Sequence, residues 1–292
     1  MITHHQLLRE GEKRLLAAGQ GEQAALLLFN ELARRRGVNL YMDLDEPCSE
    51  QLQIDYLEGL HRMELGEPLG YVLGEEPFYG YDFIVNKDVL IPRPETEELV
   101  ALVLSLMDEE MADVEHPKIF DVGTGSGAIA ISLSLEEPRA DVFASDISRP
   151  AVIVAEANNQ KLNGRVCFLI GDMLEPFIDR DLHCDILVCN PPYIPNEENM
   201  EKSVVDFEPH VALFGGADGL NYYRTVFERA PKVLNDHAIL AFEMGWNQGQ
   251  ALKELASKAF PGAKIEIHQD LNGKDRMLSI VTGSAEADSE QE

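Results

Sequence analysis

The pattern of apolar positions divides the chain into a helical first part and an alternating second part. In residues 1–75, apolar side chains recur every three or four positions, which is typical of amphipathic helices. The pattern covers residues 7–16, 24–32 and 49–60, and Pro68 is expected to end this part. We therefore predict a small N-terminal bundle of three or four helices, without chemistry of its own.

The apolar spacing changes to a period of two after residue 75. Aromatic and β-branched residues alternate around glycine and Asn-Lys turns, which predicts a β-hairpin-like linker over residues 76–92. Pro94 suits the first turn of a helix, and the acidic residues after it suit the positive end of that helix. The apolar stripe of this helix reaches Leu106, and we expect the acids at 108–110 to interrupt it.

Strands and helices alternate through the rest of the chain. Apolar runs predict strands at 118–122, 141–145, 166–170, 184–189, 238–243, 264–268 and 277–282. Helical periods predict helices at 129–135, 151–162, 222–234 and 248–260. This order predicts an α/β domain over residues 93–283, with a mostly parallel sheet and helices on both faces. The small, acidic residues 284–292 are expected to form a disordered tail.

Composition narrows the class of protein. An apolar share of 45% fits a globular chain, and the formal charge of −28 argues against a protein that wraps bare nucleic acid. No apolar run approaches the roughly 18 residues of a membrane span, and the N-terminus lacks the pattern of a signal peptide. We therefore expect a cytoplasmic protein.

Cysteine usage points to the same compartment. Cys48, Cys167, Cys184 and Cys189 show no Cys-x-x-Cys spacing, and three of them lie in strand-like apolar runs. They are interpreted as small buried thiols in a reducing cytoplasm, and neither a disulfide set nor a metal site is predicted.

A glycine-rich turn connects the first sheet strand to its helix. The turn contains Gly123, Thr124, Gly125, Ser126 and Gly127. Glycines allow close approach of a ligand to the backbone, and the helix amino end offers free N–H groups. At the end of the next strand, Asp146 is placed to accept hydrogen bonds from both hydroxyls of a ribose.

Two cofactors compete for this turn. Gly123, Gly125 and Ala128 satisfy a relaxed dinucleotide fingerprint, which by itself is a weak signal for nicotinamide. Asp121 disfavours that interpretation because its charge suits an α-amino group better than a pyrophosphate. Asp172, after the third strand, offers an acceptor for an adenine amino group. These features favour S-adenosylmethionine, with S-adenosylhomocysteine as the product.

The fourth strand ends in Asn190, Pro191, Pro192 and Tyr193. The prolines fix φ and remove two N–H donors, so the local carbonyls are held rigidly. The Asn190 side-chain oxygen and the Pro191 carbonyl are the predicted acceptors for a planar NH2 group, and the Tyr193 ring can stack on that group. Gripping both N–H bonds aims the nitrogen lone pair at a methyl group, and no strong general base is needed. Adenine N6, cytosine N4 and a glutamine amide all satisfy this pattern.

With these motifs, the chain resembles the bacterial protein-(glutamine-N5) methyltransferases that modify peptide chain release factors. The likeness is carried by residues 70–74 (Gly-Tyr-Val-Leu-Gly), 78–80 (Phe-Tyr-Gly), 90–97 (Leu-Ile-Pro-Arg-Pro-Glu-Thr-Glu), 123–127, 190–194 (Asn-Pro-Pro-Tyr-Ile), 207–209 (Phe-Glu-Pro), 212–213, 219–220 and 243–245 (Glu-Met-Gly). The resemblance implies a seven-stranded, Rossmann-like class I methyltransferase domain behind a helical substrate-recognition domain. It also implies that the substrate is the glutamine of the Gly-Gly-Gln loop of release factors.

The resemblance assigns roles to individual positions. It implies that the glycine turn, Asp146 and Asn190 hold the cofactor. It implies that Asn190, Pro191, Pro192 and Tyr193 hold the glutamine. Met173 stands where some members have an aromatic residue after the acid that follows the third strand, and methionine can still cover adenine. Arg93, between two prolines, is either a surface charge or a fixed donor aimed at the ligand.

Other functions remain open on the sequence. A glutamine methyltransferase of a ribosomal protein shares every motif, and an adenine-N6 methyltransferase of DNA or RNA shares the four-residue site. A cofactor-binding protein without turnover is a third alternative. The acidic charge and the absence of a basic recognition domain weigh against nucleic acid as a direct partner. We expect a monomer that docks on release factors.

Overall fold

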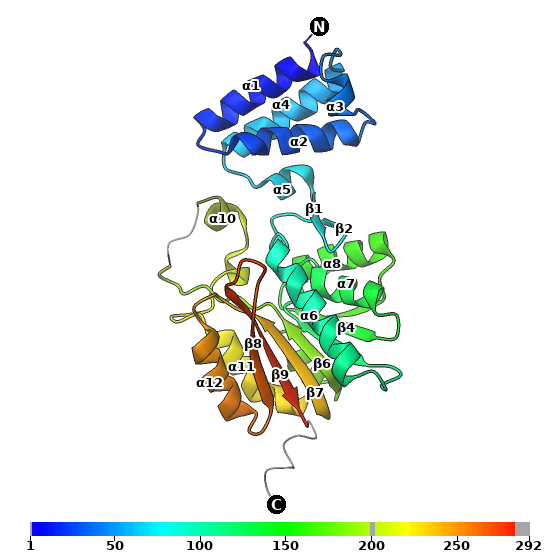
Figure 1. The fold of residues 1–292 in the computed structure, drawn as a ribbon, viewed down its shortest axis with the longest axis vertical. Coiled ribbons are helices and arrows are strands. Elements are labelled where there is room, and N and C mark those ends of the chain that lie inside the picture. Colours follow the sequence, from blue (N-terminus) through cyan, green and yellow to red (C-terminus); the bar gives the residue numbers. More distant parts are fainter. Residues whose placement is uncertain (1, 199–201, 284–292) are drawn as a thin grey trace, which may run out of the picture. The chain divides into compact units, whose positions relative to one another are not determined.

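The computed structural model describes residues 2–198 and 202–283 (Figure 1). The predicted acidic tail at 284–292 lies outside this range. The chain forms two compact units. The first contains the residues up to Glu75 together with α10 (Lys202–Phe207), and the second contains the rest of the described chain.

The first unit is helical. Its N-terminal helices are α1 (His4–Ala17), α2 (Glu22–Arg34), α3 (Leu40–Asp43), α4 (Glu50–Glu64) and α5 (Leu69–Leu73). Thr3 begins α1 with a capping box, because its side chain accepts from the backbone N–H of Gln6 and the Gln6 side chain accepts from Thr3 N–H. The fully buried Phe29 and Tyr56 pack with ring centroids 4.5 Å apart.

The sequence suggested that Pro68 ends the helical part, but one more helix, α5, follows it. Pro68 is the N-cap of α5, a position where its fixed φ and missing N–H cost nothing. The short α3 was also absent from the predicted helices. Its Asn39 cap accepts a hydrogen bond from Tyr41 N–H.

The second unit is built on a seven-stranded sheet. Its strands are β3 (Lys118–Val122), β4 (Asp141–Asp146), β5 (Val166–Ile170), β6 (Cys184–Cys189), β7 (Leu234–Glu243), β8 (Lys264–Gln269) and β9 (Asp275–Thr282). Their order is β5-β4-β3-β6-β7-β9-β8, and only the β7–β9 and β8–β9 pairings are antiparallel. The predicted α/β class with a mostly parallel sheet is confirmed. A separate two-stranded sheet, β1 (Glu75–Phe78) and β2 (Tyr81–Ile84), occupies only the first part of the predicted linker.

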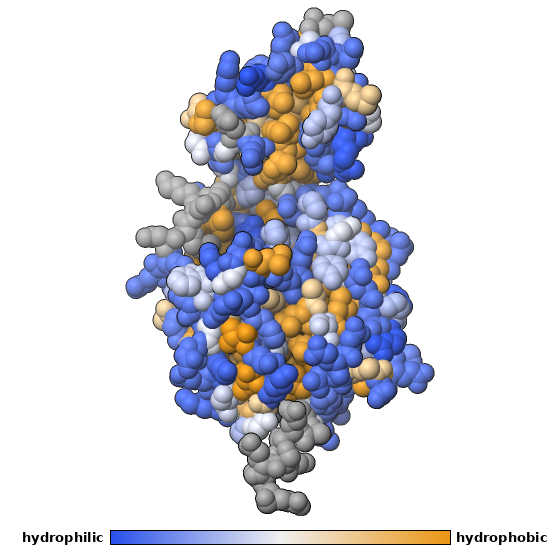
Figure 2. All heavy atoms as spheres, in the orientation of Figure 1, coloured by the Kyte–Doolittle hydropathy of each residue, from blue (hydrophilic) through white to orange (hydrophobic). Residues whose placement is uncertain are grey.

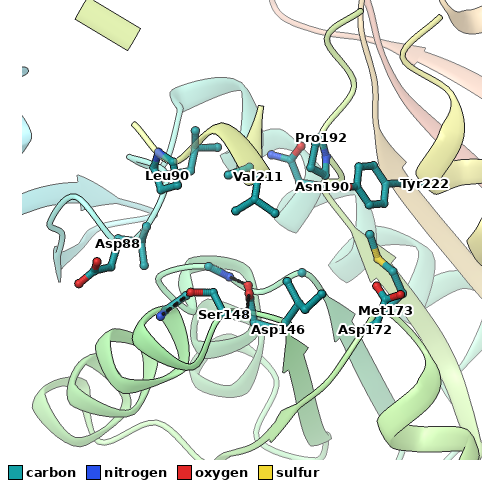
Figure 3. A pocket seen from close by; sticks show the side chains of 17 residues that line it. Asp88, Leu90, Asp146, Ser148, Asp172, Met173, Asn190, Pro192, Val211 and Tyr222 are labelled. Atoms are coloured by element: carbon teal, nitrogen blue, oxygen red, sulfur yellow. Dashed lines mark hydrogen bonds between the residues drawn. The ribbon is translucent and has the colours of Figure 1, made fainter. Parts of the chain in front are cut away.

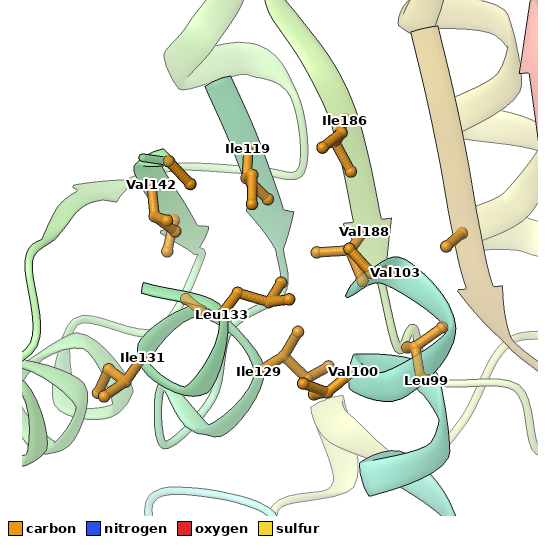
Figure 4. Packing of buried hydrophobic residues seen from close by; sticks show 14 of the residues in the cluster. Leu99, Val100, Val103, Ile119, Ile129, Ile131, Leu133, Val142, Ile186 and Val188 are labelled. Atoms are coloured by element: carbon orange, nitrogen blue, oxygen red, sulfur yellow. The ribbon is translucent and has the colours of Figure 1, made fainter. Parts of the chain in front are cut away.

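Helices cover both faces of the large sheet (Figure 1). One face carries α6 (Pro94–Glu110), α7 (Ala128–Glu136) and α8 (Arg149–Leu162), and the other carries α11 (Asn221–Arg229) and α12 (Gly249–Ala259). Adjacent strand residues point to opposite faces of the sheet. Ile119 packs with the α6 and α7 side chains (Figure 4), whereas Phe120 packs with those of α11. The sheet is therefore buried on both sides, as a parallel sheet requires.

Helix α6 is longer than predicted. The acids at 108–110 lie within it and not in a break, because their side chains lie toward solvent. Met107 and Met111 meanwhile continue the buried stripe, each 1% exposed. A run of acids on the outer face of a helix does not end it when the inner face stays apolar.

The prediction of buried thiols holds for Cys48, Cys184 and Cys189 and is wrong for Cys167, which is exposed. Cys167 lies on β5, one of the two edge strands of the sheet, where one side of the strand has no neighbour. In the described part of the chain, no helix combines the length and the apolar character needed to span a bilayer.

Polar side chains cover most of the face of each unit that Figure 2 shows, and the apolar side chains form a strip on the N-terminal unit and several separate patches on the other unit. The exposed apolar residues of the second unit include Trp246 and Leu271, and those of the first include Tyr41 and Met42.

Candidate active site

The site lies at the point where the strand order reverses. The chain runs from β3 outward to β4 and β5 and then returns to place β6 on the opposite side of β3. The loops after β3 and β6 therefore diverge, which opens a crevice at the carboxyl ends of the strands. Val122 pairs with Cys189 at these ends, so the glycine turn and Asn190 begin at the same level of the sheet.

The crevice forms a cavity (Figure 3). Its walls come from the glycine turn, the ends of the first four strands of the sheet along the chain, and the loops at 88–90 and 209–212. The lining residues are Asp88, Val89, Leu90, Gly123, Gly125, Asp146, Ile147, Ser148, Ala151, Asp172, Met173, Asn190, Pro192, Pro209, Val211, Ala212 and Tyr222. The structure thus brings seven of the predicted site residues together: Gly123, Gly125, Asp146, Asp172, Met173, Asn190 and Pro192.

The glycine turn depends on left-handed backbone angles. Gly123, Gly125 and Gly127 have φ of 77°, 55° and 81°, values that other residues adopt with strain. A Cβ on Gly127 would lie 3.2 Å from the Cβ of Ala155, so this glycine also permits close packing of α8. Thr124, Ser126 and Gly127 support the turn from behind and are not part of the cavity wall. The Ser126 carbonyl, for example, accepts from the Asn158 side chain at 2.9 Å.

Asp121 lies beneath the turn and is only 1% exposed. Its Oδ2 accepts a hydrogen bond of 2.6 Å from the Thr124 hydroxyl. Within the described residues, its Oδ1 accepts no hydrogen bond of normal geometry. The pKa of Asp121 is raised to about 7, mainly by burial and in part by the nearby Asp146 charge, while hydrogen bonds from the Thr124 hydroxyl and the Ala130 N–H oppose the rise. A cationic group beside this carboxyl would therefore pair with its ionised form.

Asp146 is held by two backbone donors. The N–H of Gly125 donates to Oδ2 at 2.9 Å, and the N–H of Ser148 donates to Oδ1 at 2.8 Å. Burial raises the pKa of Asp146, and these hydrogen bonds oppose that rise. Each oxygen keeps a lone pair that can accept from a ligand hydroxyl at the cavity wall.

Asp172, Met173 and Tyr222 form the end of the cavity opposite to Asp88 and Leu90 (Figure 3). Met173 has a φ of 48°, a left-handed value uncommon for methionine, and its carbonyl accepts a 2.9 Å hydrogen bond from the Ser145 hydroxyl. Tyr222 comes from α11 and is half-buried; burial raises the pKa of its phenol, and the Asp172 charge adds to this. The sequence analysis did not predict a role for Tyr222, because the local pattern indicates only that a helix begins there.

Asn190 is oriented by two residues that the sequence did not connect with it. Its Nδ2 donates to Oε2 of Glu243 at 2.9 Å and to Oγ1 of Thr96 at 3.2 Å. Both hydrogens of the amide are therefore engaged inside the protein. Its Oδ1 is the end of the side chain that can accept a hydrogen bond from a ligand in the cavity.

Besides Asp121, Thr124, Ser126 and Gly127, three more predicted site residues lie outside the cavity wall: Pro191, Tyr193 and Arg93. Pro191 is buried, and Tyr193 donates its hydroxyl to Oε1 of Glu243 at 3.2 Å. Burial, with the Glu243 charge, raises the pKa of Tyr193, so the phenol stays neutral. Arg93 pairs with Glu208, which is 3% exposed and had no predicted role. The signal for Glu208 was the Phe-Glu-Pro segment of the resemblance.

Metal chemistry has no candidate in this region. Across residues 2–198 and 202–283, no group of three or more His, Cys, Asp or Glu side chains is arranged to hold a metal ion.

The fold and the cavity define a Rossmann-like class I methyltransferase, whose family implies a methyl donor of the S-adenosylmethionine type. The model of the methyltransferase small domain matches residues 99–207. A methyltransferase crystal structure from Pyrococcus furiosus superposes with a TM-score of 0.51 over 77% of this chain and 98% of that one, and at 15% identity it supports the fold alone.

Comparison of sequences identifies the particular family. The model described as PrmC N-terminal domain matches residues 6–74. The release factor glutamine methyltransferase of Bacillus subtilis is 44% identical over 281 residues, which is 95% of this chain and 97% of the relative. The Bacillus anthracis protein of the same name is 40% identical over 276 residues, covering 94% and 97%. The chain belongs to the family of release factor glutamine methyltransferases, as the resemblance indicated.

Proposed function

We propose that this enzyme transfers a methyl group from S-adenosylmethionine to N5 of the glutamine side chain in the Gly-Gly-Gln motif of peptide chain release factors. Membership in the family and the orientation of Asn190 at the cavity wall support this function. When bound, S-adenosylmethionine supplies an electrophilic methyl group on a sulfonium. The residues of this chain bind it, orient the acceptor nitrogen and exclude water.

The cavity residues suit the three polar parts of this cofactor. The buried Asp121, with its unsatisfied Oδ1, would hold the α-amino group as an ion pair beneath the glycine turn. Asp146, fixed by two backbone N–H groups, would accept from the ribose hydroxyls. Asp172 would accept from the adenine amino group, with Met173 and Tyr222 against the ring.

The observation that carries the proposed acceptor is the orientation of Asn190. Because both of its N–H bonds are used by Glu243 and Thr96, Oδ1 presents an acceptor at the cavity wall. A glutamine NH2 group has two donors, and the Pro191 carbonyl is the proposed second acceptor. Two acceptors that grip both N–H bonds hold the lone pair toward the methyl group, which is catalysis by orientation and preorganised electrostatics. The Tyr193 ring is proposed to shield the amide from water.

Proton removal needs no dedicated base. The amide nitrogen becomes acidic once it is methylated and positively charged, and water can take its proton. The neutral phenol of Tyr193 is consistent with a role in packing and hydrogen bonding instead of proton abstraction.

The decisive experiment supplies radiolabelled S-adenosylmethionine with release factor, ribosomal proteins and DNA in parallel. Mass spectrometry should find one added methylene group on the Gly-Gly-Gln glutamine of release factor, and a glutamine-to-glutamate variant of that release factor should remain unlabelled. Asn190→Ala should lower the rate about 100-fold, the scale of one oriented polar contact, with a smaller effect on cofactor affinity. Label only in a ribosomal protein or in DNA would overturn the proposed substrate.

Among the alternative functions, methylation of adenine N6 is the one that the four-residue site separates least from methylation of glutamine. Adenine N6 is also a planar NH2 group, so Asn190 alone does not separate the two substrates. The formal charge of −28 disfavours DNA or RNA, whose affinity for proteins comes mainly from basic contacts to phosphates.

A further inference from the structure

Glu243 is a hydrogen-bond partner of Asn190 and does not itself touch the cavity. It is the last residue of β7 and is 2% exposed. Strand β7 lies beside β6 in the sheet, and Phe242 pairs with Cys189. The carboxylate of Glu243 therefore lies next to Asn190, on the side of the amide opposite to the cavity.

Three side chains donate hydrogen bonds to this carboxylate. Oε2 accepts from Thr96 Oγ1 at 2.6 Å and from Asn190 Nδ2 at 2.9 Å, and Oε1 accepts from the Tyr193 hydroxyl at 3.2 Å. A hydrogen bond of 2.6 Å from the Tyr223 hydroxyl to the backbone carbonyl of Glu243 fixes the end of the strand. A buried carboxylate with this many donors is an anchor point for its neighbours and not a surface charge.

The hydrogen-bond directions in this cluster leave one arrangement for Asn190. An ionised carboxylate only accepts, so the Asn190 amide must present its NH2 group to Glu243. Thr96 gives its single proton to Glu243, so its oxygen accepts the second hydrogen of Asn190 at 3.2 Å. An amide turned by 180° would place its oxygen against the carboxylate and against the Thr96 oxygen, which is repulsive.

We propose that Glu243 and Thr96 are positioning residues that lock the Asn190 amide with its oxygen toward the substrate, so that the site accepts only a nitrogen that brings N–H donors. This proposal rests on the proposed methyl transfer to an amide nitrogen and adds the residues that set its geometry. Neither residue lines the cavity, so Thr96 acts through Asn190, and Glu243 acts through Asn190 and through its hydrogen bond with Tyr193.

Thr96 offers a matched pair of variants. Thr96→Val keeps the shape of the side chain and removes the hydroxyl, whereas Thr96→Ser keeps the hydroxyl. With release factor as substrate, Thr96→Val should lower kcat about tenfold, the upper end of the effect of one lost neutral hydrogen bond. Thr96→Ser should stay within about threefold of the unaltered enzyme. The KM for S-adenosylmethionine should change little in both variants, whereas the melting temperature should fall in Thr96→Val alone, because that variant loses a hydrogen bond to the buried Glu243.

The test that separates positioning from a general structural role is a double-mutant cycle. If Thr96 acts only through Asn190, Thr96→Val should have no further effect on kcat in an Asn190→Ala background. Glu243→Gln, which can place an NH2 group against Asn190, should lower kcat in the Asn190 background and have a smaller effect in the Asn190→Ala background, where only its contact with Tyr193 remains.

Additive losses in both cycles, with an active unaltered enzyme, would overturn the positioning role and leave the proposed function intact. Equal rates for Thr96→Val and Thr96→Ser would overturn it as well. Absence of any methylation of release factor by the unaltered enzyme would instead overturn the proposed function, and this inference with it.

Discussion

Arg93 Nη2 donates to Oε1 of Glu208 at 2.5 Å, across 115 residues of sequence. The second oxygen of Glu208 accepts from the backbone N–H of Ile91 at 3.3 Å. Leu90 and Pro209, next to these groups along the chain, both line the cavity. The ion pair therefore joins two walls of the active site, which explains why the Ile-Pro-Arg-Pro and Phe-Glu-Pro segments belong to one structural feature.

Arg93→Ala should destabilise the protein, because it leaves the buried Glu208 without its cation. Arg93 is partly exposed, so we expect a loss of about 2 kcal/mol in the free energy of unfolding, below the range for fully buried pairs. The variant should also bind S-adenosylmethionine more weakly, since a wall of the cavity is loosened. Urea unfolding and calorimetric titration would measure the two effects, with Glu208→Gln and the double variant completing a cycle. An unchanged unfolding free energy with a raised KM for release factor alone would favour the predicted substrate contact of Arg93 instead.

Tyr222 should contribute to cofactor affinity through its ring. Tyr222→Leu removes the aromatic face beside Met173 and should weaken S-adenosylmethionine binding about 5- to 100-fold, the scale of one stacked base. Tyr222→Phe keeps the ring and should bind within about twofold of the unaltered enzyme. Calorimetry with S-adenosylhomocysteine avoids turnover. Equal affinities for the Leu and Phe variants would show that the ring does not contact adenine.

Asp121 should make the free protein less stable as the pH rises. Its folded pKa of about 7 is above the ordinary value of 3.8, so between these values the folded state binds a proton that the unfolded state has lost. The free energy of unfolding should then fall with rising pH, by at most about 1.4 kcal/mol per unit from this group, and level off above pH 7. Asp121→Asn should flatten that dependence. The measurement is the difference between the two proteins, because burial raises the pKa of Asp146 and Glu243 in the same direction. Parallel curves would contradict a protonated, buried Asp121.

The same carboxyl should make cofactor binding depend on pH. An α-amino cation pairs with ionised Asp121, so affinity for S-adenosylhomocysteine should rise as the pH increases toward about 7 and then level off. Titrations in buffers of different ionisation enthalpy should show proton release below that pH. The Asp121→Asn variant should bind more weakly and lose this dependence. Binding that stays constant from pH 5 to 8 in the unaltered enzyme would place the amino group elsewhere.

The local part of the fold could be predicted from the sequence because it follows from periodicity and turn chemistry. The strand predictions at 118–122, 166–170 and 184–189 coincide with β3, β5 and β6, each a short apolar run bounded by polar or turn residues. Short helices such as α9 (Glu175–Ile178) and α10 carry too few turns for a period to appear. Their boundaries depend on neighbours in space.

The same distinction holds for the site. Gly123, Gly125 and Asp146 meet at the cavity because the glycine turn and the next strand lie close together in sequence. Glu243 is 53 residues from Asn190, and Thr96 is 94 residues from it, so no local pattern connects them. Their meeting depends on the order of β6 and β7 and on the packing of α6 against β7.

The pH profile of kcat should report the charge on Glu243. Burial raises the pKa of this carboxyl, whereas the hydrogen bonds from Thr96 and Tyr193 and the nearby Arg276 lower it, and Glu95 raises it slightly. A protonated Glu243 can donate a hydrogen bond, so it no longer forces Asn190 to present its NH2 group to Glu243 and its oxygen to the substrate. The kcat at saturating cofactor should therefore fall at pH values below the pKa of Glu243. Because the Thr96 hydroxyl favours the charged form, Thr96→Val should raise that pKa and move the acid limb to higher pH, while Thr96→Ser should not. Glu243→Gln should remove the limb. Single-turnover rates from pH 5 to 9 would measure the methyl transfer step without a contribution from product release. An acid limb that is identical in the unaltered enzyme, Thr96→Val and Glu243→Gln would assign it to another group and remove the charge of Glu243 from the mechanism.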